Sequence, residues 1–265
     1  MKRFILSQAP DPGGMIRLSG KDYHYLARVR RCIPGTVFKA LLPDGEEVSV
    51  QVRSVEGVCL VGVCLSGEEP EVPVASVVLP SLVLFQALPK GAKMDLIVRQ
   101  ATEGGISEIV PFRSDHGVPA IKPGQGDEKT GRWERIIKEA RQQSGSDIAT
   151  SMRAPCTIAA LMDYWEILKG RYPTALGILL HPGGPGSLHD YLSAAPALVA
   201  LAVGPEGGFS PGEVSRFLSA GFKPLGLGTT VLRTETAALY GAAAIRIILL
   251  ERASWMPKIP HQENG

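Results

Sequence analysis

Three apolar segments of this chain each run into a glycine-rich loop, and this pattern limits the possible folds more than any other feature. Residues 175–180 run into HPGGPG, residues 197–203 run into GPEGG, and the short strand candidate 224–227 overlaps Gly-Leu-Gly at 226–228. Further apolar strands are expected at 77–84 and 106–112. Strands that alternate with helical patterns are typical of an α/β domain with a mainly parallel sheet.

The helix candidates between these strands support the same architecture. Residues 93–102 carry apolar side chains at helical spacing, whereas residues 129–143 form a polar, basic pattern. Residues 236–250 are so apolar that they predict a buried helix. The stretch Ser210-Pro-Gly-Glu213 predicts a helix start, with the serine as N-cap, the proline in the first turn and the glutamate closing a capping box.

The first 70 residues have a different, β-rich pattern. Strands are predicted at 36–42, 47–52 and 58–65, and Pro43-Asp-Gly45 is a hairpin turn signal between the first two. Residues 21–31 predict a short helix with a basic face. This part of the chain is therefore expected to fold separately from the α/β part.

The change of pattern predicts the domain boundaries. Residues 66–73 are polar, contain two prolines and read as a linker. We expect a small β-rich domain at 1–70, an α/β domain at 74–252 and a loose tail at 253–265.

Composition narrows the class of protein. A net charge of +2 permits a nucleic-acid partner without requiring one. The four cysteines form no Cys-x-x-Cys pair and lie near no histidine cluster, which argues against a metal site or a disulfide framework. The most apolar run, 72–88, is interrupted by prolines and is a poor membrane span. The prediction is a soluble, cytoplasmic protein without a metal and without a membrane partner.

The glycine loops can be interpreted either as a ligand-binding site or as ordinary turns. Ligands bind beyond the carboxyl ends of the strands in open α/β sheets, and glycine lets the backbone approach a ligand closely. Three such loops could enclose an adenosine-like ligand, although each one alone could be an ordinary turn. No G-x-x-x-x-G-K-[ST] sequence is present, and Gly226-Leu-Gly228 lacks the third glycine of a dinucleotide fingerprint. A P-loop NTPase or a Rossmann dehydrogenase has little support.

Two charged residues stand beside strongly apolar elements. Arg233 and Glu235 lie between the last strand candidate and the apolar helix. Charges in such places are costly unless they are paired or used. Arg233 could form an ion pair with Glu235 or Glu206 that braces the loops, or it could act in the function. The residues alone leave both open.

Taken together, GPEGGFS at 204–210 and LGTTVLRTETA at 227–237 resemble the 16S ribosomal RNA (uracil N3)-methyltransferase family, which belongs to the SPOUT class of RNA methyltransferases. The resemblance covers roughly residues 3 to 250. It includes a segment similar to the family's PUA-like RNA-binding domain. The further segments that carry the resemblance are 24–35, 89–103, 105–114 and 132–145.

The resemblance implies a cofactor, a substrate and an assembly. The cofactor is S-adenosyl-L-methionine, held in a deep trefoil knot, and the substrate is 16S rRNA in the small ribosomal subunit. Family members are homodimers that pack through the knotted domain. The cofactor-binding residues implied here are Leu180, His181, Gly204, Pro205, Gly207, Gly208, Leu227, Gly228, Val231, Leu232 and Thr236.

The resemblance also suggests catalytic roles. N3 of uracil carries a proton and is a poor nucleophile until that proton leaves. Arg233 is expected to stabilise the uracil anion that develops. Glu206 or Glu235 could orient Arg233 or accept a proton. Alternatively, Glu235 could cap the N-terminus of the last helix, where a carboxylate is stabilising. The general base and the target nucleotide stay open.

Basic residues in both predicted domains are candidates for phosphate contacts. For each residue taken alone, a solvated surface charge is the simpler account, and only the sets favour phosphate contacts. The candidates are Arg3, Lys21, Arg28, Arg30, Arg31, Arg132 and Arg135, with Lys138 and Arg141 on the same polar helix.

The chain departs from the family pattern at several positions. Thr230 stands where an arginine is usual, Ser146 replaces another, and Ser114-Asp115-His116-Gly117 lacks a third. Glycine replaces leucine in Thr102-Glu-Gly-Gly105, and Arg30 replaces an apolar residue. These losses thin the expected positive surface. They motivate two alternatives: a non-catalytic, ribosome-associated RNA-binding protein, and a methyltransferase of another RNA such as tRNA.

Overall fold

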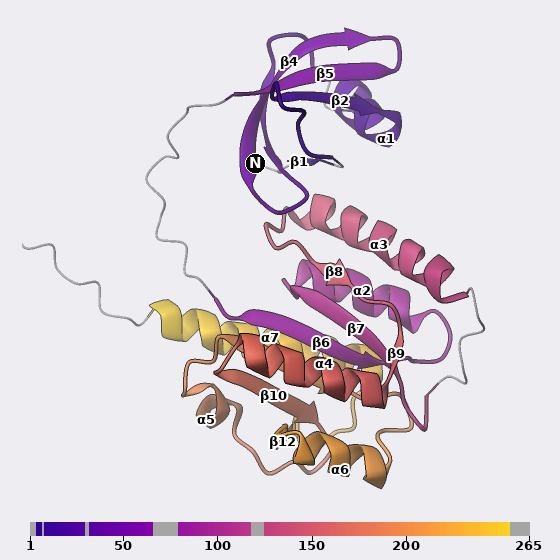
Figure 1. Cartoon of the computed structure of the whole chain (residues 1–265), viewed down its shortest axis with the longest axis vertical. Helices are drawn as coiled ribbons and strands as arrows, with labels where there is room; N and C mark the ends of the chain where they lie inside the picture. The colour runs from indigo at the N-terminus through magenta and orange to yellow at the C-terminus, as the bar shows by residue number, and fades with distance from the viewer. Residues whose placement is uncertain (1–3, 7, 30–31, 66–78, 118–124, 255–265) are drawn as a thin grey trace, which may run out of the picture. The chain divides into compact units, whose positions relative to one another are not determined.

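The computed structural model describes residues 4–6, 8–29, 32–65, 79–117 and 125–254 (Figure 1). The predicted linker, residues 255–265 of the predicted tail and three of the predicted RNA-binding arginines (Arg3, Arg30 and Arg31) lie outside these residues, whereas residues 253–254 belong to the last helix.

The chain separates into two compact units. The first contains Met1–Val74 together with Lys138–Ala149, and the second contains Ala75–Ile137 and Thr150–Gly265. The grouping of residues 138–149 with the first unit was not predicted. It comes from contacts such as the ion pair of Lys138 with Asp22, whose Nζ and Oδ2 lie 3.5 Å apart.

The first unit is built on one five-stranded sheet. In spatial order its strands are β1 (Phe4–Ile5), β3 (Val37–Leu41), β4 (Glu47–Glu56), β5 (Cys59–Leu65) and β2 (Met15–Ser19). β1 is parallel to β3, and the other pairs are antiparallel. The three predicted strands are therefore confirmed. The predicted helix begins as α1 (Gly20–Tyr23) and continues as the π-helix η1 (His24–Val29).

The second unit is built on a sheet in which every strand pair is parallel, as predicted. In spatial order the strands are β12 (Lys223–Leu225), β10 (Ala175–Leu180), β11 (Leu198–Val203), β6 (Ser81–Ala87), β7 (Glu108–Arg113) and β8 (Ser151–Met152), with β9 (Cys156–Thr157) also paired to β7. β10 has the predicted boundaries, and β11 begins one residue later than predicted. β6 extends further along the chain than the expected 77–84.

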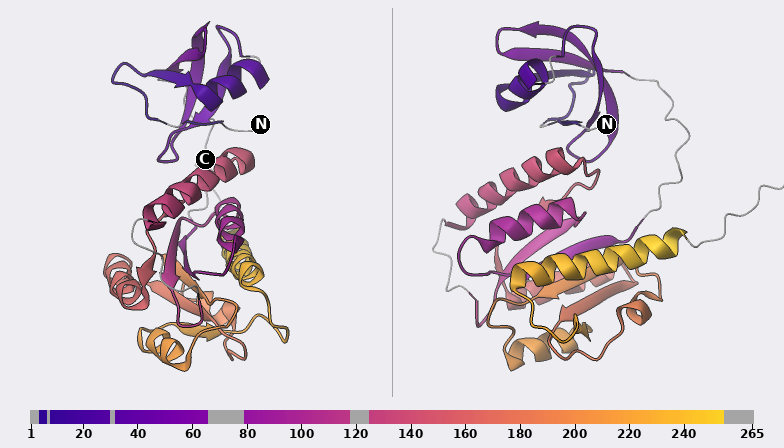
Figure 2. Two further views of the ribbon diagram at one scale, coloured as in Figure 1. Left: turned by 90° about the vertical axis from the view of Figure 1, so that its right-hand side faces the viewer. Right: turned by 180° about the vertical axis from the view of Figure 1, so that it is seen from behind.

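Helices cover both faces of this sheet (Figure 2). α2 (Lys93–Glu103), α5 (Leu188–Leu192) and α7 (Thr234–Ser254) contribute to the apolar cluster on one face, with part of α3 (Gln125–Ser144). α4 (Ile158–Arg171) and α6 (Pro211–Ser219) pack on the other face. There the rings of Trp165 and Phe222 lie 4.8 Å apart. The burial on both faces explains why the central strands are continuous apolar runs.

The structure confirms the predicted capping box and corrects another prediction. Glu213 N donates to Ser210 Oγ, and Ser210 N donates to Glu213 Oε2, so α6 starts where expected. The last helix is not wholly buried, contrary to expectation. Its inner side contacts the sheet, but Tyr240 is 59% exposed and Ile247 is 55% exposed. The helix is apolar on all sides, whereas the sheet covers only one of them.

Among the helices in the described part of the chain, none combines the length and the apolar character needed to cross a lipid bilayer.

Candidate active site

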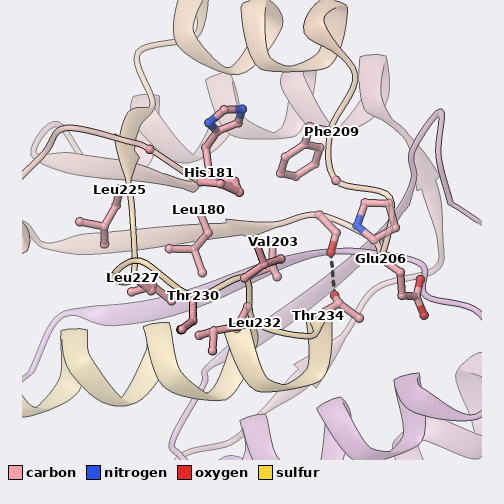
Figure 3. A pocket seen from close by; sticks show the side chains of 18 of the residues that line it. Leu180, His181, Val203, Glu206, Phe209, Leu225, Leu227, Thr230, Leu232 and Thr234 are labelled. Carbon is pink, nitrogen blue, oxygen red and sulfur yellow. Dashed lines mark hydrogen bonds between the residues drawn. The ribbon is translucent and has the colours of Figure 1, made fainter.

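Loops at the carboxyl ends of β10, β11 and β12 enclose a cavity of about 660 Å³ (Figure 3). Its walls come from residues within 180–183, 203–209 and 225–237. β10 lies between β11 and β12, so the parallel strands bring their following loops to the same edge of the sheet. The glycine loops singled out in the sequence are therefore neighbours in space.

Most of the predicted cofactor-binding residues line this cavity. Those that do are Leu180, His181, Gly204, Pro205, Gly208, Leu227, Gly228, Val231 and Leu232. Gly207 and Thr236 do not. Further lining residues were not among those implied, although most of them lie within the quoted segments 181–186, 204–210 and 227–237; Val203 and Leu225 belong to strand ends. The missed residues are Pro182, Gly183, Val203, Phe209, Leu225, Thr229, Thr230, Thr234 and Ala237.

Two of the glycine loops cross in direct contact. The amide of Gly226 donates to the carbonyl oxygen of Gly184 over 3.2 Å. A Cβ atom on Gly184 would lie 2.7 Å from the amide nitrogen of Leu225 and 2.8 Å from its carbonyl carbon. The close approach of the two backbones therefore requires a residue without a side chain at position 184.

A buried hydrogen-bond chain fastens the start of α7 to the floor of the cavity. Thr234 Oγ1 donates to the carbonyl oxygen of Gly204 over 2.6 Å, and Gln86 Nε2 donates to Thr234 Oγ1 over 3.0 Å. Gln86 is fully buried and also donates to the carbonyl of Ala87. These bonds connect the loop after β11 and the first turn of α7 to strand β6.

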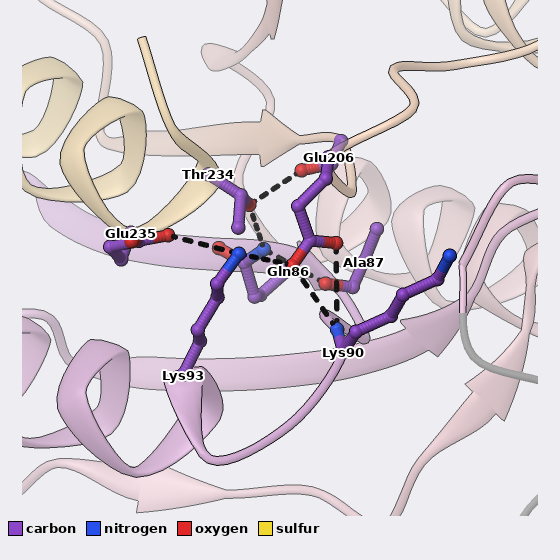
Figure 4. A network of polar contacts seen from close by, with 8 residues as sticks. Gln86, Ala87, Lys90, Lys93, Glu206, Thr234 and Glu235 are labelled. Carbon is purple, nitrogen blue, oxygen red and sulfur yellow. Dashed lines mark hydrogen bonds and ion pairs between the residues drawn. The ribbon is translucent and has the colours of Figure 1, made fainter.

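The carboxylates of Glu206 and Glu235 are held by a lysine that sequence reasoning missed (Figure 4). Lys93 Nζ lies 2.5 Å from Glu206 Oε1 and 3.9 Å from Glu235 Oε2. The amide of Lys90 also faces the Glu206 carboxylate, at 3.3 and 3.4 Å. Lys93 is the first residue of α2. Its pairing with the two glutamates could not be predicted because it is far from both in sequence.

Arg233 takes no part in that cluster. Its side chain is exposed and forms no ion pair within the described residues. The suggestion that Arg233 braces the loops by pairing with Glu206 or Glu235 is therefore wrong, because Lys93 fills that role. Arg233 itself is not among the residues that line the cavity, although its chain neighbours Leu232 and Thr234 are.

The environment of Glu206 bears on its predicted role. Burial raises the pKa of its carboxyl group, but the hydrogen bonds from Lys93 and from the backbone amides of Glu206 and Lys90 outweigh this, so the pKa lies below its usual range. A carboxylate of this kind holds a proton weakly. The geometry therefore favours Glu206 as a group that fixes the loop over Glu206 as a proton acceptor.

The same interactions predict a pH-dependent stability difference. A carboxyl group whose pKa is lower in the folded state stabilises the protein at neutral pH, and this contribution disappears as the pH falls through the folded pKa. We expect Glu206→Gln to lower the midpoint of urea unfolding at pH 7, with the difference from the unmodified protein shrinking below about pH 4. Glu103→Gln, at an exposed position on α2, is the control. If the urea midpoints of the two proteins differ by the same amount at pH 7 and below about pH 4, the ion pair of Glu206 with Lys93 does not contribute to stability.

A second polar cluster joins the loop after β7 to the loop after β11. Glu213 is 3% exposed. Its carboxylate accepts hydrogen bonds from Ser114 Oγ and from the amide of Asp115, both over 3.0 Å. Ser210 Oγ donates to Asp115 Oδ2 over 2.6 Å. The segment in which the family arginine is absent is thus firmly attached to the start of α6.

The described basic candidates differ in their surroundings. Arg28 and Arg135 are exposed, and Lys21 is 95% exposed, with its Nζ 3.8 Å from Glu139. Arg132 is paired with Asp95. Arg141 is only 6% exposed and donates to the carbonyl of Pro43, so little of its side chain is accessible to a phosphate.

Within the described ranges, no three histidine, cysteine, aspartate or glutamate side chains are arranged to hold a metal ion.

Comparison with known proteins gives a consistent result. A family model described as an RNA methyltransferase domain matches residues 78–246. The chain is 32% identical to the ribosomal RNA small subunit methyltransferase E of a Synechocystis strain, over 88% of this chain and 73% of that protein. It is 28% identical to the protein of the same name from Bacillus subtilis, over 92% of this chain and 96% of that protein.

Solved structures share the fold. A Legionella pneumophila protein in complex with the bound cofactor SAM is 26% identical, covers 93% of this chain and 98% of its own, and has a TM-score of 0.75. A ribosomal RNA small subunit methyltransferase E from Neisseria gonorrhoeae, bound to S-adenosyl methionine, is 22% identical with the same TM-score, over 94% and 98% of the two chains. At 22% identity, the similarity to the Neisseria gonorrhoeae structure shows a shared fold and nothing further.

Proposed function

The chain belongs to the RNA methyltransferase family that includes the ribosomal RNA small subunit methyltransferases E, and on this premise we propose that it methylates N3 of a uridine in 16S rRNA. The methyl donor is S-adenosyl-L-methionine. A protein with this substrate would work in the cytoplasm, where small ribosomal subunits are assembled.

The observation that carries this proposal is the cavity formed by the glycine loops. A cavity of about 660 Å³ lies within the range of small-ligand sites. Leucine and valine side chains give it apolar walls suited to an adenine ring, and the glycine backbones offer amide and carbonyl groups without obstruction. The residues present therefore fit the cofactor, which supplies an electrophilic methyl group on a positively charged sulfur.

Five polar residues in and around the site have a role in the proposal. Arg233 would stabilise the negative charge that develops on the uracil oxygens. Lys93 would hold Glu206, and with it the loop that forms one wall of the cavity. Thr234 and Gln86 would keep the start of α7 in place. The predicted trefoil knot belongs to this proposal as well.

Contacts with the RNA would come from exposed basic residues of each unit. Lys21 and Arg28 are the described candidates of the first unit, and Arg135 is an exposed candidate on α3. Arg132 would have to share its charge with Asp95, which weakens its candidacy. We assign these groups to phosphate contacts, which position an RNA without reading its sequence.

The proposal includes a homodimer. α7 exposes Tyr240, Ile247 and Leu250, and Leu96 on α2 is 43% exposed. Large apolar side chains that are exposed together on neighbouring helices commonly mark an interaction surface. The resemblance to a homodimeric family makes a second copy the expected occupant. A molar mass of one chain by light scattering would contradict it.

The reaction can be tested directly. The purified protein would be incubated with S-adenosyl-L-methionine and small ribosomal subunits from a strain that lacks the family enzyme. We expect 3-methyluridine in the digested rRNA by mass spectrometry. Cofactor binding without this product would point to another RNA. The loss of both would favour the non-catalytic RNA-binding protein.

A further inference from the structure

His116 lies on the loop after β7 and is fixed by the cavity loop. Its Nδ1 atom lies 3.1 Å from the carbonyl oxygen of Gly207. A carbonyl oxygen can only accept a hydrogen bond, so this contact requires the hydrogen of the neutral ring to be on Nδ1. Nε2 then carries a free lone pair, which is the form of histidine that accepts protons.

The surroundings hold the ring in this orientation. A Cβ atom on Gly207 would lie 2.9 Å from the Cβ atom of His116, so the two residues are in close contact. On the other side, the amide of Asp115 and the hydroxyl of Ser114 donate to the buried carboxylate of Glu213. The loop therefore has little freedom to move the imidazole away from Gly207.

The ring lies next to the cavity wall. Gly207 stands between Glu206 and Gly208, which both line the cavity. His116 itself is exposed, so an RNA base at the rim of the cavity can reach it. Glu206, the residue before Gly207, is also the cavity residue that pairs with Lys93.

The other candidate bases are less suitable. Glu206 and Glu235 are both engaged by Lys93. His181 lines the cavity, but Figure 3 shows its ring directed away from Thr234 and Glu206. No hydrogen bond within the described residues fixes its tautomer. Of these groups, His116 alone combines exposure, a fixed tautomer and a free lone pair.

We propose that His116 is the general base that removes the N3 proton of the target uridine. This proposal rests on the proposed function. The proton passes from N3 to Nε2, and the electron pair of the N–H bond forms the new bond from N3 to the methyl carbon. The pair of the broken carbon–sulfur bond stays on sulfur, which becomes a neutral thioether, and the imidazole becomes an imidazolium.

Charged groups near this ring lie on several elements. Asp115 is its neighbour in the loop, Glu213 lies on α6, and Glu206 lies on the loop after β11. Lys90 and Lys93, at the start of α2, neutralise part of this negative charge.

The tautomer is the first test, and it needs no RNA. In ¹⁵N-labelled protein at a pH where the ring is neutral, NMR should show His116 with hydrogen on Nδ1. His116→Asn identifies the signal. A ring with hydrogen on Nε2 would overturn the proposal, whatever the activity of the protein.

Matched substitutions provide the second test. Asparagine places an amide nitrogen near the position of Nδ1 and can keep the bond to Gly207, whereas glutamine imitates Nε2; neither is a base. We expect both His116→Asn and His116→Gln to lower kcat at neutral pH by about 100-fold or more, with cofactor affinity and melting temperature unchanged. Raising the pH should restore part of the rate, because N3 then loses its proton unaided.

A control variant and two specific outcomes separate a general base from a structural or RNA-binding residue. His189→Asn, at an exposed position on α5, should keep full activity. Full activity of His116→Asn with loss in His116→Gln would show that the residue only holds the loops together. A raised KM for RNA with unchanged kcat would show an RNA contact. Both results would overturn the proposal, whereas an inactive unmodified protein would contradict the proposed function itself.

Discussion

Replacing Arg233 with alanine is expected to lower kcat by about 10²- to 10³-fold and to leave cofactor affinity unchanged. The side chain is exposed, lies in sequence between the cavity residues Leu232 and Thr234, and forms no ion pair in the described part of the chain. Its removal therefore leaves no buried partner charge, and the fold should not suffer. The loss would reflect missing stabilisation of the uracil anion. Methylation of small subunits measures kcat, and calorimetry measures affinity for S-adenosyl-L-methionine.

Two companion variants sharpen this experiment. Arg171→Ala removes an exposed arginine from the last turn of α4, outside the cavity lining, and should retain full activity. Arg233→Lys keeps the charge but loses the planar pair of donors, so its rate should fall between the two. If a folded Arg233→Ala protein turns over normally, the catalytic assignment of Arg233 is wrong.

The second large effect is expected for Gly184→Ala. The new methyl group would lie under 3 Å from three backbone atoms of Leu225 and Gly226. Backbone atoms cannot move aside as a flexible side chain can, so the two crossing loops must separate. We expect a loss of about 1–3 kcal/mol in the free energy of unfolding, together with a large loss of cofactor affinity, since Leu225 and Gly183 line the cavity.

A nearby glycine offers the matched control for this variant. A Cβ atom on Gly212, in the first turn of α6, would approach no atom closer than Ser210 Oγ at 3.9 Å. Gly212→Ala should keep cofactor affinity and stability. Urea unfolding and calorimetry distinguish the two variants. Equal behaviour would mean that the crossing of the loops does not depend on glycine.

Local chemistry explains why much of the site could be predicted. The Ser210–Glu213 capping box is a short-range motif, and the structure contains both of its hydrogen bonds. The ends of β10 and β11 follow from apolar runs that stop at glycine and proline. Their loops meet because parallel strands share one carboxyl edge. The prediction that these loops lie side by side therefore required only the assignment of a parallel α/β sheet.

The contacts that the sequence did not reveal are all long-range. Lys93 and Glu206 are 113 residues apart, and Gln86 and Thr234 are 148 residues apart. No periodicity marks such pairs. The exposed side of α7 was missed for a different reason. A helix that is apolar on all sides looks buried in sequence, and a surface that meets a partner molecule has the same composition.

The hydrogen bonds of Thr234 also determine when the cofactor site can exist during synthesis. The third wall of the cavity comes from residues 225–237, more than 120 residues after the lysine that steadies the Glu206 loop. A nascent chain that has reached only β11 has two of the loops but lacks the enclosing wall. A chain truncated before residue 225 would therefore lack one of the three cavity walls, and we expect it to lose affinity for S-adenosyl-L-methionine.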